Sequence, residues 1–208
     1  MDNHPQAVVL KWFFLMELTL RKSPGECGNG LTAPTPRLAG DTLFVTAFYN
    51  GSLALRLGGE KPVVMWQSPK VTEKDTTYLH SIIPTPFLED GHIYGICSYG
   101  QLRCLKLETG ERLWETLAAT TPEKETRWGN AFLVKQGDRF WIFNERGHLI
   151  IARLTPQGYT EISRVKLLDA TNRDPGRPVV WSHPAFANRS VYARNDQEIV
   201  RASLAAPQ

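Results

Sequence analysis

The sequence has few of the residue groupings that carry catalysis or metal binding. It contains three cysteines, none of them in the paired spacing of a zinc site, and its five histidines show no metal-ligand spacing. No glycine-rich phosphate loop and no Gly-x-Ser-x-Gly nucleophile elbow occurs. These absences argue against a zinc protein, a P-loop nucleotide-binding protein and a serine hydrolase of the common type.

Long apolar runs and concentrated charge are also lacking. The most apolar stretch near the amino terminus, residues 8–18, is interrupted by Lys11 and Glu17 and is shorter than the roughly 20 residues a membrane-spanning helix needs. It is not preceded by the basic residues of a signal peptide. The net charge of +3 comes from lysines and arginines scattered along the chain. We therefore expect no membrane span, no export signal in the chain as given and no nucleic-acid partner.

Cysteine usage leaves two alternatives for one predicted hairpin. Cys97 and Cys104 flank the same turn, so they are expected on neighbouring strands where they could approach each other. Cysteines within strands usually pack as small apolar groups. The sequence favours buried free thiols over a disulfide at this hairpin.

The sequence is well supplied with glycine and proline, 16 and 14 residues, which fits short strands separated by turns. Turn glycines recur at Gly51, Gly100 and Gly147, and a degenerate copy follows at residues 194–198. A repeat of about 49 residues is typical of a four-stranded propeller blade. We predict an all-β fold, a β-propeller of about four blades of four antiparallel strands, which also fits part of a seven- or eight-bladed ring.

The repeats divide the chain into two regions. Residues 32–206 hold the propeller repeats, and the last copy lacks a fourth strand at its carboxyl end. Residues 1–31 are predicted to form an amino-terminal segment with one outer strand, at residues 8–12, and a linker. The alternative for this segment is a short amphipathic helix over residues 8–20.

One copy carries a recognisable motif. The run from Leu105 to Trp114, LKLETGERLW, resembles the tryptophan-docking motif of PQQ-like, or quinoprotein-type, β-propeller repeats, and the segment around Trp66 matches it in part. The resemblance extends over residues 32–206. It implies that Trp66 and Trp114 dock on a neighbouring blade, and that Thr109 and Gly110 form the hairpin before the second of these indoles.

The resemblance implies two functions. One is a non-catalytic, WD40-like binding or scaffold module for a protein segment or extended ligand, similar to the exported propellers that assist outer-membrane protein assembly. The other is a truncated fragment of a PQQ-dependent dehydrogenase, which would require PQQ and calcium. Such dehydrogenases use a neighbouring disulfide and about eight blades, whereas this chain has four repeats and no adjacent cysteines. We therefore favour the scaffold, without enzyme activity or cofactor. The resemblance also implies a periplasmic or exported protein, and a homodimer is one way to complete a larger ring.

Candidate binding residues lie just before the innermost strand of each repeat, where blades crowd a central channel. These residues are His80, Arg127, Trp128, Asn130, Trp181 and His183. They are predicted to line one pocket; the alternative is that the tryptophans plug the channel and the histidines satisfy backbone groups. The charged turns at 144–146 and 194–196 are interpreted as local turn chemistry, so Asn195 is expected to contribute little to stability.

Overall fold

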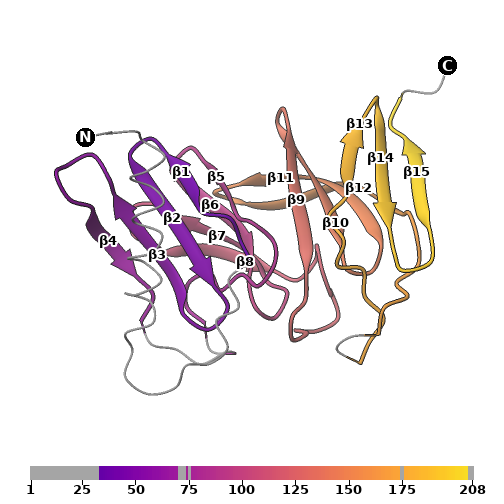
Figure 1. Cartoon of the computed structure of the whole chain (residues 1–208), viewed down its shortest axis with the longest axis horizontal. Helices are drawn as coiled ribbons and strands as arrows, with labels where there is room; N and C mark the ends of the chain where they lie inside the picture. The colour runs from indigo at the N-terminus through magenta and orange to yellow at the C-terminus, as the bar shows by residue number, and fades with distance from the viewer. Residues whose placement is uncertain (1–32, 70–73, 75, 174–175, 206–208) are drawn as a thin grey trace, which may run out of the picture. The chain divides into compact units, whose positions relative to one another are not determined.

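The computed structural model describes residues 33–69, 74, 76–173 and 176–205, which belong to one compact unit, Leu31–Gln208. The amino-terminal segment predicted for residues 1–31, with its alternative strand and helix, lies outside the described residues. Within them, every helix-or-strand element is a β-strand (Figure 1). No helix in this part of the chain is long and apolar enough to cross a bilayer.

The strands form successive antiparallel sheets whose members pair in chain order. The first sheet contains β1 (Arg37–Ala39), β2 (Thr42–Ala47), β3 (Gly51–Arg56) and β4 (Val63–Gln67). The second contains β5 (Phe87–Glu89), β6 (His92–Ile96), β7 (Leu102–Lys106) and β8 (Arg112–Thr116). The third contains β9 (Ala131–Gln136), β10 (Arg139–Asn144), β11 (His148–Thr155) and β12 (Gly158–Lys166). The fourth contains β13 (Ala185–Ala187), β14 (Ser190–Arg194) and β15 (Ile199–Ser203).

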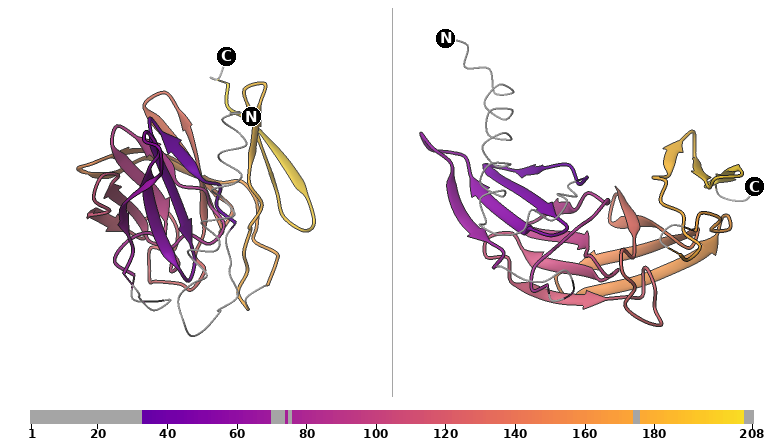
Figure 2. Two further views of the ribbon diagram at one scale, coloured as in Figure 1. Left: turned by 60° about the vertical axis from the view of Figure 1, so that its left-hand side comes forward. Right: turned by 60° about the horizontal axis from the view of Figure 1, so that its bottom comes forward.

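This architecture confirms the predicted all-β fold of repeated sheets. The described part of the fourth sheet has three strands, with β15 at its edge. The two views of Figure 2 follow the described chain from the first sheet to the fourth in sequence order. Each repeat is therefore a meander that pairs with itself before the chain moves to the next.

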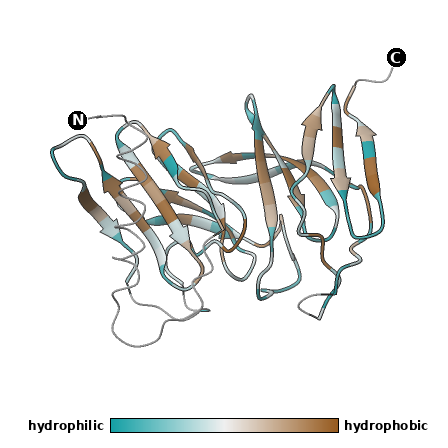
Figure 3. Ribbon diagram, in the orientation of Figure 1, coloured by the Kyte–Doolittle hydropathy of each residue, from teal (hydrophilic) through white to brown (hydrophobic). Residues whose placement is uncertain are grey.

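Apolar side chains hold neighbouring sheets together. One buried cluster joins the first sheet to the second and includes Phe44, Trp66, Ile93 and Leu105. A second cluster joins the second sheet to the third, and a third joins the third sheet to the fourth. In Figure 3 the apolar colour is concentrated on the strands. The core is thus a series of interfaces between sheets, as expected where one repeat cannot bury its own apolar faces.

Two indoles link consecutive sheets through the same contact. Trp66 Nε1 donates a hydrogen bond to the carbonyl oxygen of Leu107 at 2.8 Å, and Trp114 Nε1 donates to that of Thr155 at 2.8 Å. Each acceptor lies 41 residues beyond its tryptophan, where the third strand of the next sheet ends. The contact places both tryptophans between sheets.

The Thr-Gly turn of the motif is shaped by these rings. Gly110 has φ +74°, and a Cβ there would collide with the ring of Tyr78, which stacks on Trp66 at 5.3 Å between centroids. Thr109 Oγ1 accepts a hydrogen bond from the backbone N–H of Glu111 at 3.2 Å. Glycine is required at this turn because the backbone conformation and the close indole both exclude a side chain.

The two cysteines of the second sheet are buried and free. Cys104 lies on β7, and burial raises the pKa of its thiol to about 11. Cys97 lies just beyond β6 and receives a hydrogen bond from the buried guanidinium of Arg103 at 3.0 Å. Both thiols therefore belong to the core of the second sheet.

Candidate functional site

The predicted site residues do not all meet in one place. His80 is fully buried, and its Nδ1 lies 3.0 Å from the carbonyl oxygen of Phe48, just after β2. Burial lowers the pKa of His80 to about 4, so the ring is neutral near pH 7. Its Nε2 is buried without a hydrogen-bond partner. His80 therefore lies within the packing of the first two sheets, against the loop that follows β2.

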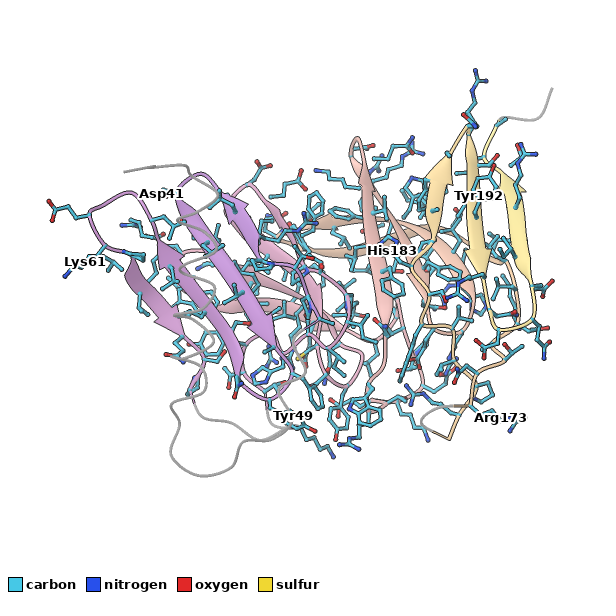
Figure 4. All side chains as sticks on the ribbon, viewed as in Figure 1. Asp41, Tyr49, Lys61, Arg173, His183 and Tyr192 are labelled. Carbon is cyan, nitrogen blue, oxygen red and sulfur yellow. The ribbon has the colours of Figure 1, made fainter. Side chains whose placement is uncertain are left out.

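His183 and Trp128 lie on two other loops. The ring of His183 packs on Phe132 of β9 at 4.8 Å between centroids, and its Nδ1 lies 2.7 Å from the carbonyl oxygen of Pro184 (Figure 4). Trp128 has φ +61°, its ring lies 4.3 Å from the guanidinium carbon of Arg127, and its buried Nε1 has no hydrogen-bond partner. A non-glycine residue held at positive φ marks a strained loop position.

Asn130 and Trp181 meet at a residue that the sequence did not single out, Glu145. The Glu145 side chain is only 2% exposed. Its Oε2 accepts hydrogen bonds from the backbone N–H of Asn130 at 3.1 Å and from Trp181 Nε1 at 3.2 Å. Arg177 donates to both carboxylate oxygens, at 3.1 and 2.9 Å. A buried carboxylate needs such hydrogen bonds to replace the water that it loses on burial.

The backbone of Glu145 adds further links. Its N–H donates to the carbonyl oxygen of Asn130 at 3.0 Å, and its carbonyl oxygen accepts from the N–H of Val180 at 2.7 Å. The loop before β9 and the loop leading to β13 are thus fastened to the β10–β11 turn. We call this set, Asn130, Glu145, Arg177 and Trp181, the Glu145 cluster.

Local sequence fixes the turn that presents Glu145. Asn144 is fully buried, and its Oδ1 accepts hydrogen bonds from the N–H groups of Arg146 and His148, both at 3.1 Å. Gly147 has φ +79°, and a Cβ there would collide with the carbonyl of Leu168. Asn144 and Gly147 shape the turn. The side chains of Glu145, Arg146 and His148 are therefore not needed to form it, and all three line the pocket described next.

A pocket of about 580 Å³ lies beside this turn. Most of its lining residues are polar or charged, and they come from the loop before β9, the β10–β11 turn with the start of β11, the end of β12 and the segment after β12. The lining residues are Thr121, Lys124, Thr126, Glu145, Arg146, His148, Lys166, Asp169, Ala170, Arg177 and Pro178. Glu145 belongs to both the pocket and the cluster, so it connects the predicted residues Asn130 and Trp181 to this cavity.

The pocket lining carries more positive than negative charge. Arg177 is paired with Glu145, Lys166 Nζ lies 2.5 Å from Asp169, and Arg146 forms a two-point ion pair with Glu123, at 2.9 and 2.6 Å. The last of these pairs is exposed, so it exchanges readily with other anions. Together with Lys124, these cations give the pocket lining an excess of positive charge.

His148 adds a neutral nitrogen to the same pocket. Burial, and then the positive charges of Arg164, Lys166 and Arg146, lower the pKa of His148. Its Nδ1 is buried and has no hydrogen-bond partner. The lowered pKa favours the uncharged imidazole, and its Nδ1 is enclosed by the protein.

The carboxylates of the pocket do not suit calcium. Calcium is bound by several oxygens, usually including carboxylates. Glu145 is occupied by Arg177, and Asp169 faces Lys166. Among the described residues, no group of three or more histidine, cysteine, aspartate or glutamate side chains is placed to hold a metal. These residues therefore do not fit the calcium of a quinoprotein.

Most of this site could not be found from the sequence. The segment Asn144–Glu145–Arg146 reads as turn chemistry, and Asn144 does serve that purpose. Glu145 differs because its partners lie 15, 32 and 36 residues away. The sequence offers one signal for this site. The turn before Gly147 contains Glu145 and Arg146, whereas the equivalent turns of the first two repeats contain Tyr49 and Tyr99.

Comparison with known proteins identifies the fold. No protein-family model and no curated protein matches the chain. Among solved structures, BamB from Moraxella catarrhalis has a TM-score of 0.54 at 16% identity, over 81% of this chain and 41% of that one. The β-propeller domain of Cps50 (Swd1) from Myceliophteria thermophila has a TM-score of 0.51 at 12% identity, over 78% of this chain and 52% of that one.

A computationally designed protein, Ika4, has a TM-score of 0.50 at 8% identity, over 88% of this chain and 95% of that one. The chain thus spans less than half the length of the BamB structure it resembles. At these identities the similarity shows the fold alone. The fold is that of a β-propeller, as the repeat length and the quinoprotein-type motif predicted.

Proposed function

We propose that this chain is a non-catalytic β-propeller module that binds a segment of another protein in the pocket beside the Glu145 cluster. The observation that carries the proposal is the buried Glu145 carboxylate, which fastens two long loops to the β10–β11 turn. Loops held in this way present a preformed surface, and binding then loses less conformational entropy. A rigid scaffold with functional loops is a common arrangement for binding proteins.

The lining favours a segment that carries carboxylates. Lys124, Arg146 and Lys166 place positive charge at the pocket, and the Arg146–Glu123 pair is exposed enough to exchange for a ligand carboxylate. Charged groups at the rim of a binding site raise the association rate and select partners by charge. The ring of His148 lines the same pocket.

The predicted residues take different parts in this proposal. Asn130 and Trp181 position Glu145, and the Asn130 amide has both its nitrogen and its oxygen buried and unpaired. A buried amide without partners is costly and calls for an explanation. A peptide group of the ligand, reached by a small movement of the loop, would satisfy it. Arg127, Trp128 and His183 lie on the same loops and are proposed to extend the contact, whereas His80 is outside the site.

The proposal is tested by panning the full chain against a phage-displayed peptide library. Selected peptides should be rich in aspartate and glutamate and should bind Arg146→Glu at least about tenfold more weakly, because a charge that attracts the ligand is reversed. The matched control is Arg153→Glu, an exposed arginine on β11 that is paired with Asp138 and is not part of the pocket lining. Failure to select peptides, or equal binding to both variants, would overturn the proposal.

A further inference from the structure

The first sheet presents an apolar row on the face turned away from the second sheet. In the strand register, Leu38 pairs with Leu43, Leu43 with Leu55, and Leu55 with Val64. Residues directly opposite on neighbouring strands share one face of a sheet. Leu38 is 61% exposed and Val64 is 55% exposed. An apolar row this exposed is unusual on a surface that faces only water.

The second sheet shows what such a row does inside the molecule. Its equivalent residues, Leu88, Ile93 and Leu105, occupy the same register. There they pack in the buried cluster that contains Phe44 and Trp66 of the first sheet. Ile93 and Leu105 are completely buried by this packing. The row on each sheet is therefore the surface that receives the sheet before it.

An aromatic ring fills the opposite face at each interface. On the second strand of each sheet, the residue after the apolar row is aromatic and points to the other face. These residues are Phe44, Tyr94 and Trp141 in the first three sheets. Tyr94 meets Phe140 of the third sheet at 5.9 Å between centroids, and Trp141 meets Phe186 of the fourth sheet at 5.8 Å. The ring of one sheet thus packs toward the row of the next.

The fourth sheet carries the same aromatic residue at the end of the series. Tyr192 follows Val191, which packs toward the third sheet, and so Tyr192 points away from it. Figure 4 shows Tyr192 on the last sheet of the described chain and Asp41 on the first. Ile199, 73% exposed, shares the face of Tyr192 through the register of β14 and β15. In the described part of the chain, no further sheet follows this face.

We propose that a second copy of this chain joins the two faces, with the Tyr192 face of one copy docked on the Leu38–Leu43–Leu55–Val64 row of the other. The contact continues the interface that already connects consecutive sheets, with the same positions on both sides. It is head-to-tail, because different surfaces of the two copies meet. Such contacts form a closed assembly where the rotation permits and an open polymer where it does not.

Sedimentation and light scattering of the full chain test the proposal. The wild-type protein should associate with rising concentration toward twice the mass of one chain. Leu38→Asp and Tyr192→Ala should each weaken association about tenfold or more, because each removes apolar contact from one side of the interface. The matched control, Val165→Asp, changes a 53% exposed valine on β12 that belongs to neither face and should leave association unchanged.

Mixing the two variants separates a head-to-tail contact from a symmetric one. Leu38→Asp retains an intact Tyr192 face, and Tyr192→Ala retains an intact leucine row. Their mixture should therefore associate more tightly than either variant alone. A wild-type monomer at all concentrations would overturn the proposal. So would a dimer broken by Leu38→Asp but not by Tyr192→Ala, which would mean that two first sheets face each other.

Discussion

Glu145 shows how a single turn residue can organise distant parts of the chain. Its carboxylate is almost completely buried, yet it accepts hydrogen bonds from Asn130, Arg177 and Trp181. In a medium of low polarity, a carboxylate without these donors would be strongly destabilising. The stability of this region therefore depends on Arg177 remaining in place.

Replacing Arg177 with alanine is expected to lower the free energy of unfolding by about 3 kcal/mol, because Glu145 would remain buried without its cation. Chemical denaturation measures the change. The double variant Glu145→Gln with Arg177→Ala should lose less than Arg177→Ala alone, since no buried charge is left unpaired. Arg153→Ala, which breaks an exposed pair with Asp138, is the control and should have little effect. A loss equal to that of the control would contradict a buried ion pair.

His80 gives the molecule a pH dependence of stability. Its pKa is about 4 in the folded chain, against an ordinary value of 6.5, chiefly because the ring is buried. The unfolded chain therefore binds a proton at a pH where the folded chain does not. The contribution of neutral His80 to the free energy of unfolding is fully present above pH 6.5. It falls by about 3 kcal/mol in all as the pH decreases to 4.

Nuclear magnetic resonance of the histidine rings provides the measurement. The His80 ring should stay neutral down to about pH 4. His148 also has a lowered pKa and contributes in the same direction, so His148→Gln is used to isolate His80. A His80 signal that titrates near pH 6.5 in the folded protein would show that the ring is not buried.

Asn195 corrects an expectation drawn from the sequence. The turn at 194–196 was expected to contribute little, but Asn195 is only 6% exposed. Its Oδ1 accepts hydrogen bonds from the N–H groups of Gln197 and Glu198, both at 2.8 Å, and its Nδ2 donates to the carbonyl oxygen of Asp169 at 2.9 Å. The last bond connects two loops distant in sequence, which turn propensity alone does not reveal.

Asn195→Ala is therefore expected to cost about 2 kcal/mol, because three partly buried backbone groups lose their hydrogen-bond partner. Thermal and chemical denaturation would measure it. Asn188→Ala, in the exposed turn between β13 and β14, is the comparison and should cost less, although Asn188 has φ +49°. Equal losses would restore the simpler interpretation of Asn195 as a turn former.

At the scale of secondary-structure elements, the outer strands β4 and β8 act through their tryptophans. In both sheets the indole pairs with the third strand just before a register shift, at Ala54 and at Cys104. A bulge turns the strand locally and re-aims its side chains. Here it directs the indole toward the next sheet, where the N–H finds a backbone carbonyl.

Trp66→Ala is expected to cost about 3–5 kcal/mol, since a large ring is removed from between two sheets. Trp66→Phe should cost less, because aromatic packing remains and only the hydrogen bond to Leu107 is lost. Denaturant midpoints of the two variants give the comparison. If Trp66→Phe is as damaging as Trp66→Ala, the hydrogen bond contributes more than the ring does.

The elements were largely predictable, because their signals are local. Gly51, Gly100 and Gly147 mark hairpins through backbone conformations that only glycine adopts easily, and the strands between them are rich in branched and aromatic residues. The candidate site was predictable only in part. Position before an inner strand points to Asn130 and Trp181, but their meeting at Glu145 depends on how the third and fourth sheets pack.

At the scale of the whole molecule, the quinoprotein-type motif and the chemistry of the pocket lead to different expectations for cofactors. The motif is accounted for by the packing of Trp66 and Trp114 between sheets. Adding PQQ and calcium to the full chain should leave its melting temperature and visible absorption unchanged, because binding to the folded state alone would raise the melting temperature. A shift that requires both additions would favour a dehydrogenase fragment instead.

The outer strand of the third sheet, β12, lacks the tryptophan that β4 and β8 carry. Trp66 and Trp114 each pair with the third strand just before its register shift. The residue of β12 at the same position is Ser163, which is exposed. The Glu145 cluster and an apolar patch fasten the last repeat in its place. A ligand that steadies Glu145 and Arg177 would therefore slow amide-hydrogen exchange in β14 and β15, since occupancy and attachment of the last repeat are thermodynamically linked. Ligand binding at the β10–β11 turn would thus control how often the fourth sheet separates from the third.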